Sequence, residues 1–407
     1  MSKAKKLRAK KSEAKQEFDE PPWGQLIRQI HDAHAHMVLA VTGGGSQAIA
    51  ALLEVPGASR TVLEAIVPYS PESLAAFLGA RPEQSCSQRT ARAMAMAAYQ
   101  RALRYVMGEA PAPQPLAGVA CTASLVSDRP KHGPHRVHVA LQTATTTLAQ
   151  SVELVKGRRS RAEEEALAAK LVLNLAAEAG GIDERVEAGF SPVESLQVAR
   201  SEAPGEWQGL LDGRREAVAV RTGAAKKPAV RRLIFPGAFN PRHDAHRRMA
   251  QMAAEQLGLP VEHEISILNV DKPPLDFLEL EHRAAQFAAD ETLWLTRAAT
   301  FAEKAVMFAP ATFIVGADTI ARIAHPRYYG GEPACQAAID RMAALDCRFL
   351  VFGRQVQGCF HVPGTLGLHE SLLRLCDVVP ADRFRHDVSS TALRKASDGG
   401  SEITQTD

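Results

Sequence analysis

The residue types best suited to chemistry are two histidines, His243 and His246, which follow a turn rich in glycine, asparagine and proline. The stretch 229–235 before the turn predicts a short buried strand, and residues 247–257 after it predict a helix that ends at Gly258. Histidines three positions apart face the same side of a helix. A strand, a glycine turn and a helix N-terminus together form an anion site, because unpaired N–H groups and the helix dipole point at it. Two imidazoles beside such a site suit a phosphoryl or nucleotidyl group that gains charge during displacement, and the alternative is a structural corner with incidental histidines.

Further polar groups follow later predicted strands. These are Lys272 after a strand at 264–268, Asp318 after one at 312–315, and Arg354 after one at 349–353. Ligands of open α/β sheets bind outside the carboxyl ends of the strands, so we expect these groups at one edge. Ser389 to Arg394 read as a helix start with hydroxyls at the cap, which can hold triphosphate oxygens. Each alone has an ordinary alternative, such as a helix cap or a turn residue, but their joint order favours one nucleotide site.

The order of these residues resembles the nicotinamide/nicotinate mononucleotide adenylyltransferase family of the HxGH nucleotidyltransferases, over residues 229–397. The positions that carry the resemblance are Gly237, Phe239, Asn240, Pro241, His243, His246, Gly316, Ala317, Asp318, Ser389, Ser390, Thr391 and Arg394. The resemblance implies a Rossmann-like doubly wound parallel sheet. It also implies an enzyme of NAD biosynthesis that joins ATP to a pyridine mononucleotide with Mg²⁺, giving a dinucleotide and pyrophosphate.

The same resemblance implies catalytic roles for His243, His246 and Arg394, with the histidines at the α-phosphorus. It implies ATP or mononucleotide contacts for Gly237, Ala238, Phe239, Asn240, Lys272, Arg283, Gly316, Asp318, Arg354, Ser389, Ser390 and Thr391, and no metal ligand among the side chains. The mononucleotide phosphate is then the nucleophile, so positioning and charge neutralisation carry the reaction without a general base. One departure is Ala245, which stands where the family usually has glycine, at a point where backbone approaches phosphate.

Three alternatives remain open from the sequence. The nucleotidyl group, adenylyl or cytidylyl, could go to another acceptor, such as phosphopantetheine or a polyol phosphate, and residues near Lys272 and Trp294 would decide this. The domain could be a non-catalytic nucleotide sensor if Ala245 blocks productive phosphate placement. The third alternative is an amidohydrolase in the N-terminal part of the chain.

That N-terminal part alternates predicted helices and strands from residue 23 to 181, and it resembles the CinA C-terminal domain, the nicotinamide-nucleotide amidohydrolase family. The stretches that carry the resemblance are Thr42 to Ser46, Val55 to Ser59, Tyr69 with Ser70, and Gly157 to Arg159. Counting along these stretches places Thr42 at the nucleophilic serine and Leu74 at the lysine that acts as base. The family's glycine-rich stretch is replaced by residues 122–127.

Because leucine cannot accept a proton, we expect a degenerate amidohydrolase site with Thr42, Ser46 and Tyr69, retained for binding, assembly or regulation. Hydrolysis through Thr42 or Ser46 is the alternative. Three further histidines, His31, His34 and His36, are expected to be solvated or satisfied in the core, with metal or base roles as the alternative. CinA-like domains commonly self-associate, so the resemblance also suggests a homo-oligomer.

The composition sets the frame for these sites. With 407 residues, the chain is long enough for several domains, and we expect a disordered charged tail at 1–20, an α/β domain at 21–182, a connector at 183–228, a second α/β domain at 229–397 and a polar tail at 398–407. The basic residues of the first tail favour a solvated segment, with a nucleic-acid or targeting arm as the alternative.

The balance of residue types is that of an ordinary soluble protein, with 46% hydrophobic and 23% charged residues. A net charge of +2 argues against wholesale binding of nucleic acid or membrane. Six scattered cysteines without paired spacing favour free thiols, and no apolar run approaches a membrane span. We therefore expect a cytoplasmic protein whose partners are ATP and a pyridine mononucleotide.

Overall fold

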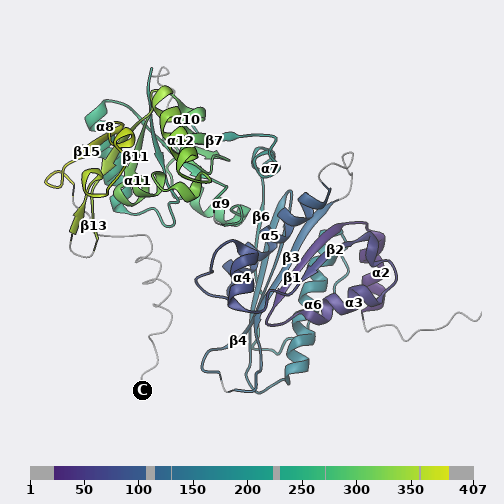
Figure 1. The fold of residues 1–407 in the computed structure, drawn as a ribbon. Coiled ribbons are helices and arrows are strands. Elements are labelled where there is room, and N and C mark those ends of the chain that lie inside the picture. The colour runs from purple at the N-terminus through teal and green to yellow at the C-terminus, as the bar shows by residue number, and fades with distance from the viewer. Residues whose placement is uncertain are drawn as a thin grey trace, which may run out of the picture. The chain divides into compact units, whose positions relative to one another are not determined.

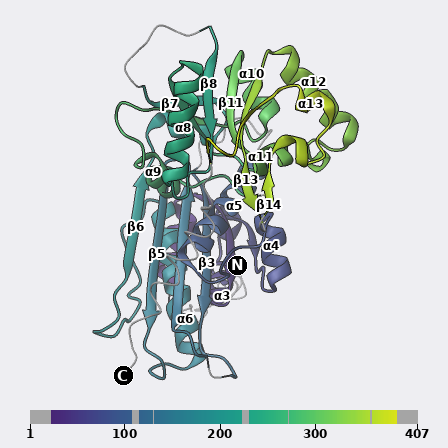
Figure 2. The same cartoon turned by 90° about the vertical axis from the view of Figure 1, so that its left-hand side faces the viewer.

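The computed structural model describes residues 23–106, 115–129, 131–222, 230–270, 272–356 and 359–384, without the side chains of 354–356 and 359. The chain forms two compact units, and the boundary between them in the sequence lies between Ala199 and Arg200. Two short segments before this boundary, 78–80 and 144–147, are grouped with the second unit. Both units are α/β, with helices packed on a sheet (Figures 1 and 2). The two expected terminal tails lie outside the described residues.

A six-stranded sheet forms the first unit, in the spatial order β2-β1-β3-β4-β5-β6. Its strands are β1 (His36–Thr42), β2 (Val62–Ile66), β3 (Leu116–Ser124), β4 (His135–Thr143), β5 (Thr146–Leu154) and β6 (Gln197–Glu202). Strand β1 pairs in parallel with β2 and β3, whereas β3 and β4 are antiparallel. The sheet is therefore mixed, and β1 lies between two parallel neighbours with its carboxyl end at the glycine turn after Thr42.

The helices of the first unit cover both faces of this sheet. They are α2 (Gly24–Asp32), α3 (Ser46–Glu54), α4 (Pro71–Leu78), α5 (Gln88–Val106) and α6 (Arg161–Ala179), with a 3₁₀ turn at Ala58–Arg60. Side chains of α2, α3 and α6 share one apolar core with β1, β3 and β4. On the other face, α5 lies so close to β3 that a Cβ at Gly118 would be 2.0 Å from the carbonyl oxygen of Ala95.

A seven-stranded sheet forms the second unit, in the order β15-β12-β11-β8-β9-β10-β7. Its strands are β7 (Ala217–Arg221), β8 (Arg232–Pro236), β9 (Val261–Ser266), β10 (Thr292–Thr296), β11 (Ala311–Gly316), β12 (Arg348–Phe352) and β15 (Cys376–Val379). All neighbours pair in parallel except β7, which is antiparallel to β10 at the edge. The six parallel strands thus have the 3-2-1-4-5-6 order, and a doubly wound parallel sheet is what the family resemblance implied.

The remaining elements connect these strands. They are α7 (Gly205–Leu211), α8 (Asp244–Leu257), α9 (Phe277–Ala284), α10 (Phe301–Phe308), α11 (Ala317–Ile323), α12 (Glu332–Ala344), α13 (Glu370–Leu373), the β13–β14 hairpin (Arg354–Val356 and Cys359–His361) and 3₁₀ turns at Pro326–Tyr328 and Pro363–Thr365. Helices α10 and α12 pack on the face that carries Ile234 and Phe313. Helix α8 meets the opposite face, where the ring of His246 lies 6.0 Å from that of Phe235.

The stretch 183–228, expected to be a connector with some helix, contributes an edge strand to each sheet, β6 and β7, with α7 between them. Strand β6 is mostly exposed and lacks an apolar run, whereas β7 carries the apolar run 217–220 and is mostly half-buried. Among the described residues, no helix has the length and apolar character of a membrane span. The cysteines that the structure describes, Cys86, Cys121, Cys335, Cys347 and Cys376, are all free thiols.

Candidate active site

The strand order of the second sheet reverses between β8 and β11, which lie side by side while their following connections run to opposite sides. In open α/β sheets, ligands bind in the crevice outside the carboxyl ends of the strands at this point. The turn that leads to His243 and His246 follows β8 directly, and Gly316 ends β11, with Asp318 in the first turn of α11. The fold therefore brings these two predicted groups to the place where a doubly wound sheet binds its ligand.

The two imidazoles are stacked on each other at the start of α8. Their ring centroids are 3.8 Å apart with an interplanar angle of 25°. The backbone N–H of His243, which occupies the N-cap position of the helix, donates to Nδ1 of His246 at 3.2 Å. A backbone N–H can only donate, so Nδ1 of His246 accepts, and a neutral His246 carries its proton on Nε2.

Burial keeps His246 neutral. Desolvation, with the positive charges of His243 and Arg242 as smaller causes, lowers the pKa of His246 to about 3. The ring packs edge-on against Phe239, with centroids 5.2 Å apart. His246 is thus a hydrogen-bond donor without a charge at physiological pH, and its orientation is fixed by the helix start and by the aromatic side chains around it.

The first residues of the turn are shaped by one aromatic side chain. Phe239 is 1% exposed and has a φ of 44°, and a Cβ on Gly237 would come within 2.7 Å of its ring. Glycine at 237 is therefore required by packing. The N–H of Gly237 donates to the carbonyl of Glu264 in β9 at 3.0 Å, which ties the turn to the neighbouring strand.

Arg283, predicted to contact substrate, is bonded to the turn and to its own helix. Its Nε and Nη2 donate to Glu279 Oε1 at 2.9 and 2.7 Å, and its Nη1 donates to the carbonyl of Ala238 at 2.9 Å. The same Glu279 oxygen accepts from Nδ2 of Asn240 at 2.7 Å. Helix α9 therefore contacts the turn through a buried ion pair.

Sequence reasoning missed a second set of contacts to this turn. The backbone N–H of Arg242 donates to Gln286 Oε1 at 2.7 Å, and its guanidinium donates to both carboxylate oxygens of Glu291 at 2.7 and 2.5 Å. His263 on β9 lies 3.5 Å from the same guanidinium, and burial lowers the pKa of His263 to about 4. The signal in the sequence was the polar spacing of Glu279 and Arg283, which places both on one face of α9, with Gln286 following in the turn after the helix.

The other predicted contact residues lie at the same edge or outside the described part. Lys272 is exposed in the loop after β9. Gly316 caps α11, and a Cβ added there meets no atom within 4 Å. Trp294 is instead turned toward Glu262 and Arg232, with Nε1 2.8 Å from the Glu262 carboxylate. Ala245 is only 5% exposed, so its methyl group is covered by protein. The positions outside the described side chains are Arg354, Ser389, Ser390, Thr391 and Arg394.

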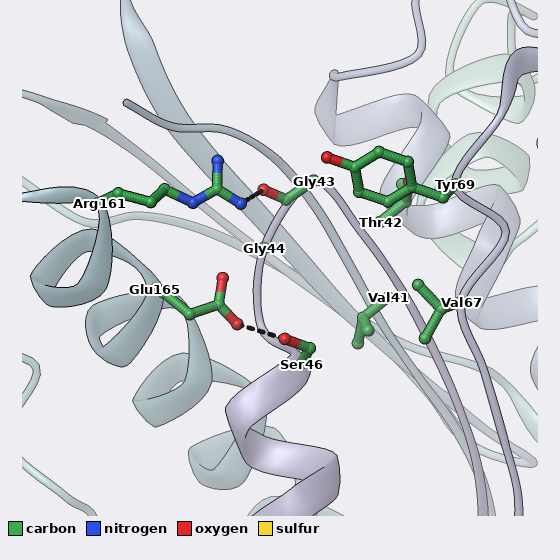
Figure 3. A pocket seen from close by; sticks show the side chains of 9 residues that line it. All are labelled: Val41, Thr42, Gly43, Gly44, Ser46, Val67, Tyr69, Arg161 and Glu165. Carbon is green, nitrogen blue, oxygen red and sulfur yellow. Dashed lines mark hydrogen bonds between the residues drawn. The ribbon is translucent and has the colours of Figure 1, made fainter. Parts of the chain in front are cut away.

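The first unit holds a separate pocket at the carboxyl end of β1, with a cavity volume of about 90 Å³ (Figure 3). It brings together Thr42, Ser46 and Tyr69, the three residues predicted for the degenerate amidohydrolase site. Arg161 and Glu165, both from α6, complete the lining together with Val41, Gly43, Gly44 and Val67. Sequence reasoning missed both charged side chains, because they lie more than 100 positions away from the glycine turn.

The carboxylate of Glu165 lies at the N-terminus of α3, where the unpaired N–H groups of a helix favour an anion. Its Oε1 accepts from the hydroxyl of Ser46 at 2.9 Å and from the N–H of Gln47 at 3.2 Å. Arg161 donates to the carbonyl of Gly43 at 2.9 Å. The lining residues include no lysine or histidine, and Leu74, which stands at the expected base position, is 2% exposed in the core. The described pocket thus offers hydroxyls without a neutral base beside them.

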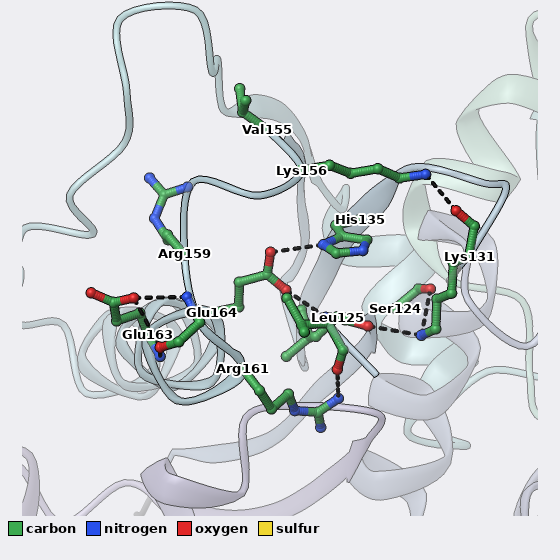
Figure 4. A network of polar contacts seen from close by, with 12 residues as sticks. Ser124, Leu125, Lys131, His135, Val155, Lys156, Arg159, Arg161, Glu163 and Glu164 are labelled. Atoms are coloured by element: carbon green, nitrogen blue, oxygen red, sulfur yellow. Dashed lines mark hydrogen bonds and ion pairs between the residues drawn. The ribbon is translucent and has the colours of Figure 1, made fainter. Parts of the chain in front are cut away.

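The first turn of α6 also holds the neighbouring loop in place (Figure 4). Glu164 is fully buried, accepts from the N–H of Val126 at 2.7 Å and lies 2.8 Å from Nδ1 of His135. Glu163 instead forms the capping box with Ser160. The run of three glutamates therefore divides into one helix cap, Glu163, and two buried acceptors, of which Glu165 lines the pocket.

The three histidines near residue 35 do not form a site. His31 is fully buried, and its ring nitrogens lie 2.7 Å from Thr61 Oγ1 and 3.0 Å from the carbonyl of Leu52. His34 is exposed and His36 begins β1. In the part of the chain that the structure describes, no cluster of three or more histidine, cysteine or acidic side chains could hold a metal ion.

Comparisons with known proteins gave matches to parts of the chain. Residues 234–396 match the cytidylyltransferase-like family, so the second unit contains a domain of this type. No curated protein sequence matches the chain. Among solved structures, competence/damage inducible protein CihA from Agrobacterium tumefaciens is 22% identical with a TM-score of 0.30 and covers 38% of this chain and 94% of its own.

Two further solved structures are similar. A CinA superfamily protein from Escherichia coli is 14% identical with a TM-score of 0.26, over 41% of this chain and 90% of that one. The nicotinic acid mononucleotide adenylyltransferase of Plasmodium falciparum, in complex with APC, is 15% identical with a TM-score of 0.25, over 40% of this chain and 82% of that one. At these identities and scores, the likenesses leave the substrates of the chain open.

Proposed function

We propose that the second unit transfers an adenylyl group from MgATP to the phosphate of nicotinamide or nicotinate mononucleotide, giving a dinucleotide and pyrophosphate. The observation that carries the proposal is the stacked pair His243 and His246 at the start of α8, at the point where the strand order reverses. The match of residues 234–396 to the cytidylyltransferase-like family supports nucleotidyl transfer as the reaction class.

In this mechanism the two histidines act as donors. Nε2–H of a neutral His246 donates to a phosphate oxygen whose charge grows as the mononucleotide phosphate attacks the α-phosphorus of ATP. The N-terminus of α8 adds its dipole and unpaired N–H groups at the same place. Burial of His246 makes these donors rigid and strengthens them, because water is excluded around them.

Mg²⁺ enters this scheme with ATP as part of the substrate. Magnesium usually keeps several waters and is held by substrate phosphates and one or two carboxylates, so it needs no dedicated cage of side chains. In the proposal, Ser389 to Thr391 and Arg394 hold the β- and γ-phosphates.

The proposed acceptor is tested by incubating the whole chain with MgATP and, in separate reactions, nicotinamide mononucleotide, nicotinate mononucleotide, phosphopantetheine and a polyol phosphate. We expect a dinucleotide and pyrophosphate, identified by mass, with at least one of the two pyridine mononucleotides. Product formed only with phosphopantetheine or the polyol phosphate would keep nucleotidyl transfer but reject the substrate, and no product with any acceptor would reject the enzyme.

A further inference from the structure

Hydrogen bonds connect most of the turn between β8 and α8 to helix α9 and to Gln286, which lies just after that helix. Five hydrogen bonds connect the two segments, from Arg283 to Ala238, from Gln286 to Phe239, from Asn240 to Glu279, from Arg242 to Gln286, and from the Arg242 guanidinium to the carbonyl of Gln286. We infer that Glu279, Arg283 and Gln286 are positioning residues, which set the location of His243 and His246 without touching substrate. This inference rests on the proposed function for its kinetic consequences only.

Arg283 and Glu279 form the buried centre of this contact. Their side chains are 7% and 11% exposed, and two guanidinium nitrogens of Arg283 converge on one carboxylate oxygen of Glu279. The third guanidinium nitrogen, Nη1, donates to the carbonyl of Ala238. A buried arginine paired in this way is held by charge-assisted bonds and has fixed geometry, which suits a support and not a flexible substrate contact.

Gln286 uses both ends of its amide on the turn. Nε2 donates to the carbonyl of Phe239 at 2.9 Å, and Oε1 accepts from the N–H of Arg242 at 2.7 Å. Because one neighbour is a carbonyl and the other an N–H, the orientation of the amide is determined by its partners. Those partners flank the Asn240 and Pro241 pair, so Gln286 fixes both sides of the bend that delivers the chain to His243.

Helix α9 also follows directly after the loop that carries Lys272. That loop is closed by the N–H of Leu275, which donates to the carbonyl of Ile267 at 2.8 Å, and α9 then starts at its N-cap Asp276. The predicted acceptor loop and the histidine turn are therefore supported by the same rigid element. A loss of support from α9 should displace the histidines, and a displacement of about 1 Å can cost about a hundredfold in rate.

The test compares three variants of the whole chain on the α9 segment. Gln286→Glu keeps the size of the side chain and the oxygen that accepts from the Arg242 N–H, but it removes the N–H that donates to the Phe239 carbonyl. Arg283→Lys keeps the positive charge but removes the planar guanidinium that donates to both Glu279 and Ala238. The matched control is Glu281→Gln, an exposed position on the same helix. Two readouts are measured, steady-state kinetics with MgATP and the mononucleotide, and hydrogen–deuterium exchange of the peptide around 236–246.

We expect both variants to lower kcat by about ten- to a hundredfold with KM for either substrate changed less than about threefold, and to raise exchange in that peptide. The control should match the wild type in both readouts. A raised KM with unchanged kcat and unchanged exchange would show that Arg283 binds substrate and would overturn the inference. If the wild-type chain shows no turnover, the proposed function fails, and the exchange data alone then support or overturn the positioning role.

Discussion

His246 is held as a neutral donor by two features of its surroundings. Its Nδ1 accepts from the N–H of His243, and desolvation lowers its pKa to about 3. An unfolded chain would protonate this histidine below its ordinary pKa of 6.5, so folding stability is lost as the pH falls from 6.5 toward 3. Above that range the side chain contributes no charge, which favours donation from Nε2 to phosphate over proton transfer.

This predicts that His246 does not titrate near neutrality. In NMR spectra of the whole chain between pH 5 and 8, one imidazole signal should keep the shifts of a neutral ring with Nε2 protonated. The same signal should be missing from His246→Asn, which assigns it. A titration midpoint near 6.5 for this signal would contradict the buried, neutral donor.

At this scale the sequence predicted which residues belong to the turn but not what each side chain does there. The pair His243 and His246 was recognisable because its spacing and its position after a glycine turn follow from local rules. The partners of Arg283 could not be recognised from the sequence, because the ion pair of Arg283 with Glu279 reaches the Ala238 carbonyl only once α9 packs on the turn. Predicted roles of the residues from Ser389 to Arg394 remain predictions, since these lie outside the described part.

Among the elements, the glycine turn between β1 and α3 is the most tightly constrained. Gly43 has a φ of +73°, and a Cβ there would lie 1.9 Å from the carbonyl oxygen of Ala123. Gly157 has a similar φ of +76°, but a Cβ at that position would meet no atom within 4 Å. The two positions share the backbone conformation and differ only in the space around them.

We therefore expect Gly43→Ala to destabilise the first unit by about 3 kcal/mol or more, since backbone strain and overpacking add there. Gly157→Ala should cost about 1–2 kcal/mol, from the left-handed conformation alone. Thermal unfolding of both variants measures the difference. Equal losses would mean that β3 does not approach the turn as closely as the structure shows.

Some of the buried strands were predicted from their apolar runs, and other strands were not predicted. The expected strands at 312–315 and 349–353 correspond to β11 and β12, because buried parallel strands are continuously apolar. Strands β5, β6, β7, β10 and β15 were not predicted, and among them β6 is an exposed edge strand that carries little hydrophobic pattern. The doubly wound parallel sheet of the second unit was expected from a family resemblance and not from any local signal, and the structure shows such a sheet.

For the molecule as a whole, the two units hold separate sites of different character. The pocket of the first unit is lined by hydroxyls with Glu165 bonded to Ser46, whereas the candidate active site belongs to the second unit. Among the described lining residues of the first pocket, the Glu165 carboxylate is the group that accepts from the Ser46 hydroxyl. Dinucleotide synthesis should therefore not depend on its hydroxyls.

The double variant Thr42→Ala with Ser46→Ala tests this independence. We expect kcat and KM for dinucleotide synthesis within about twofold of the wild type, because neither hydroxyl takes part in the proposed reaction. The mononucleotide is also assayed for release of ammonia by both proteins. An ammonia-releasing activity present in the wild type and lost in the variant would show that the first unit is a second active site.

The most direct test of the account is the rate of dinucleotide formation by His246→Ala, measured with MgATP and the better mononucleotide and with products identified by mass. Loss of an oxyanion-type donor costs about a hundred- to a thousandfold in kcat, so we expect a decrease of that size with an unchanged melting temperature. The exposed neighbour variant Arg248→Ala, on the same helix, should retain full activity. Wild-type turnover by a folded His246→Ala would contradict the assignment of this turn as the active site.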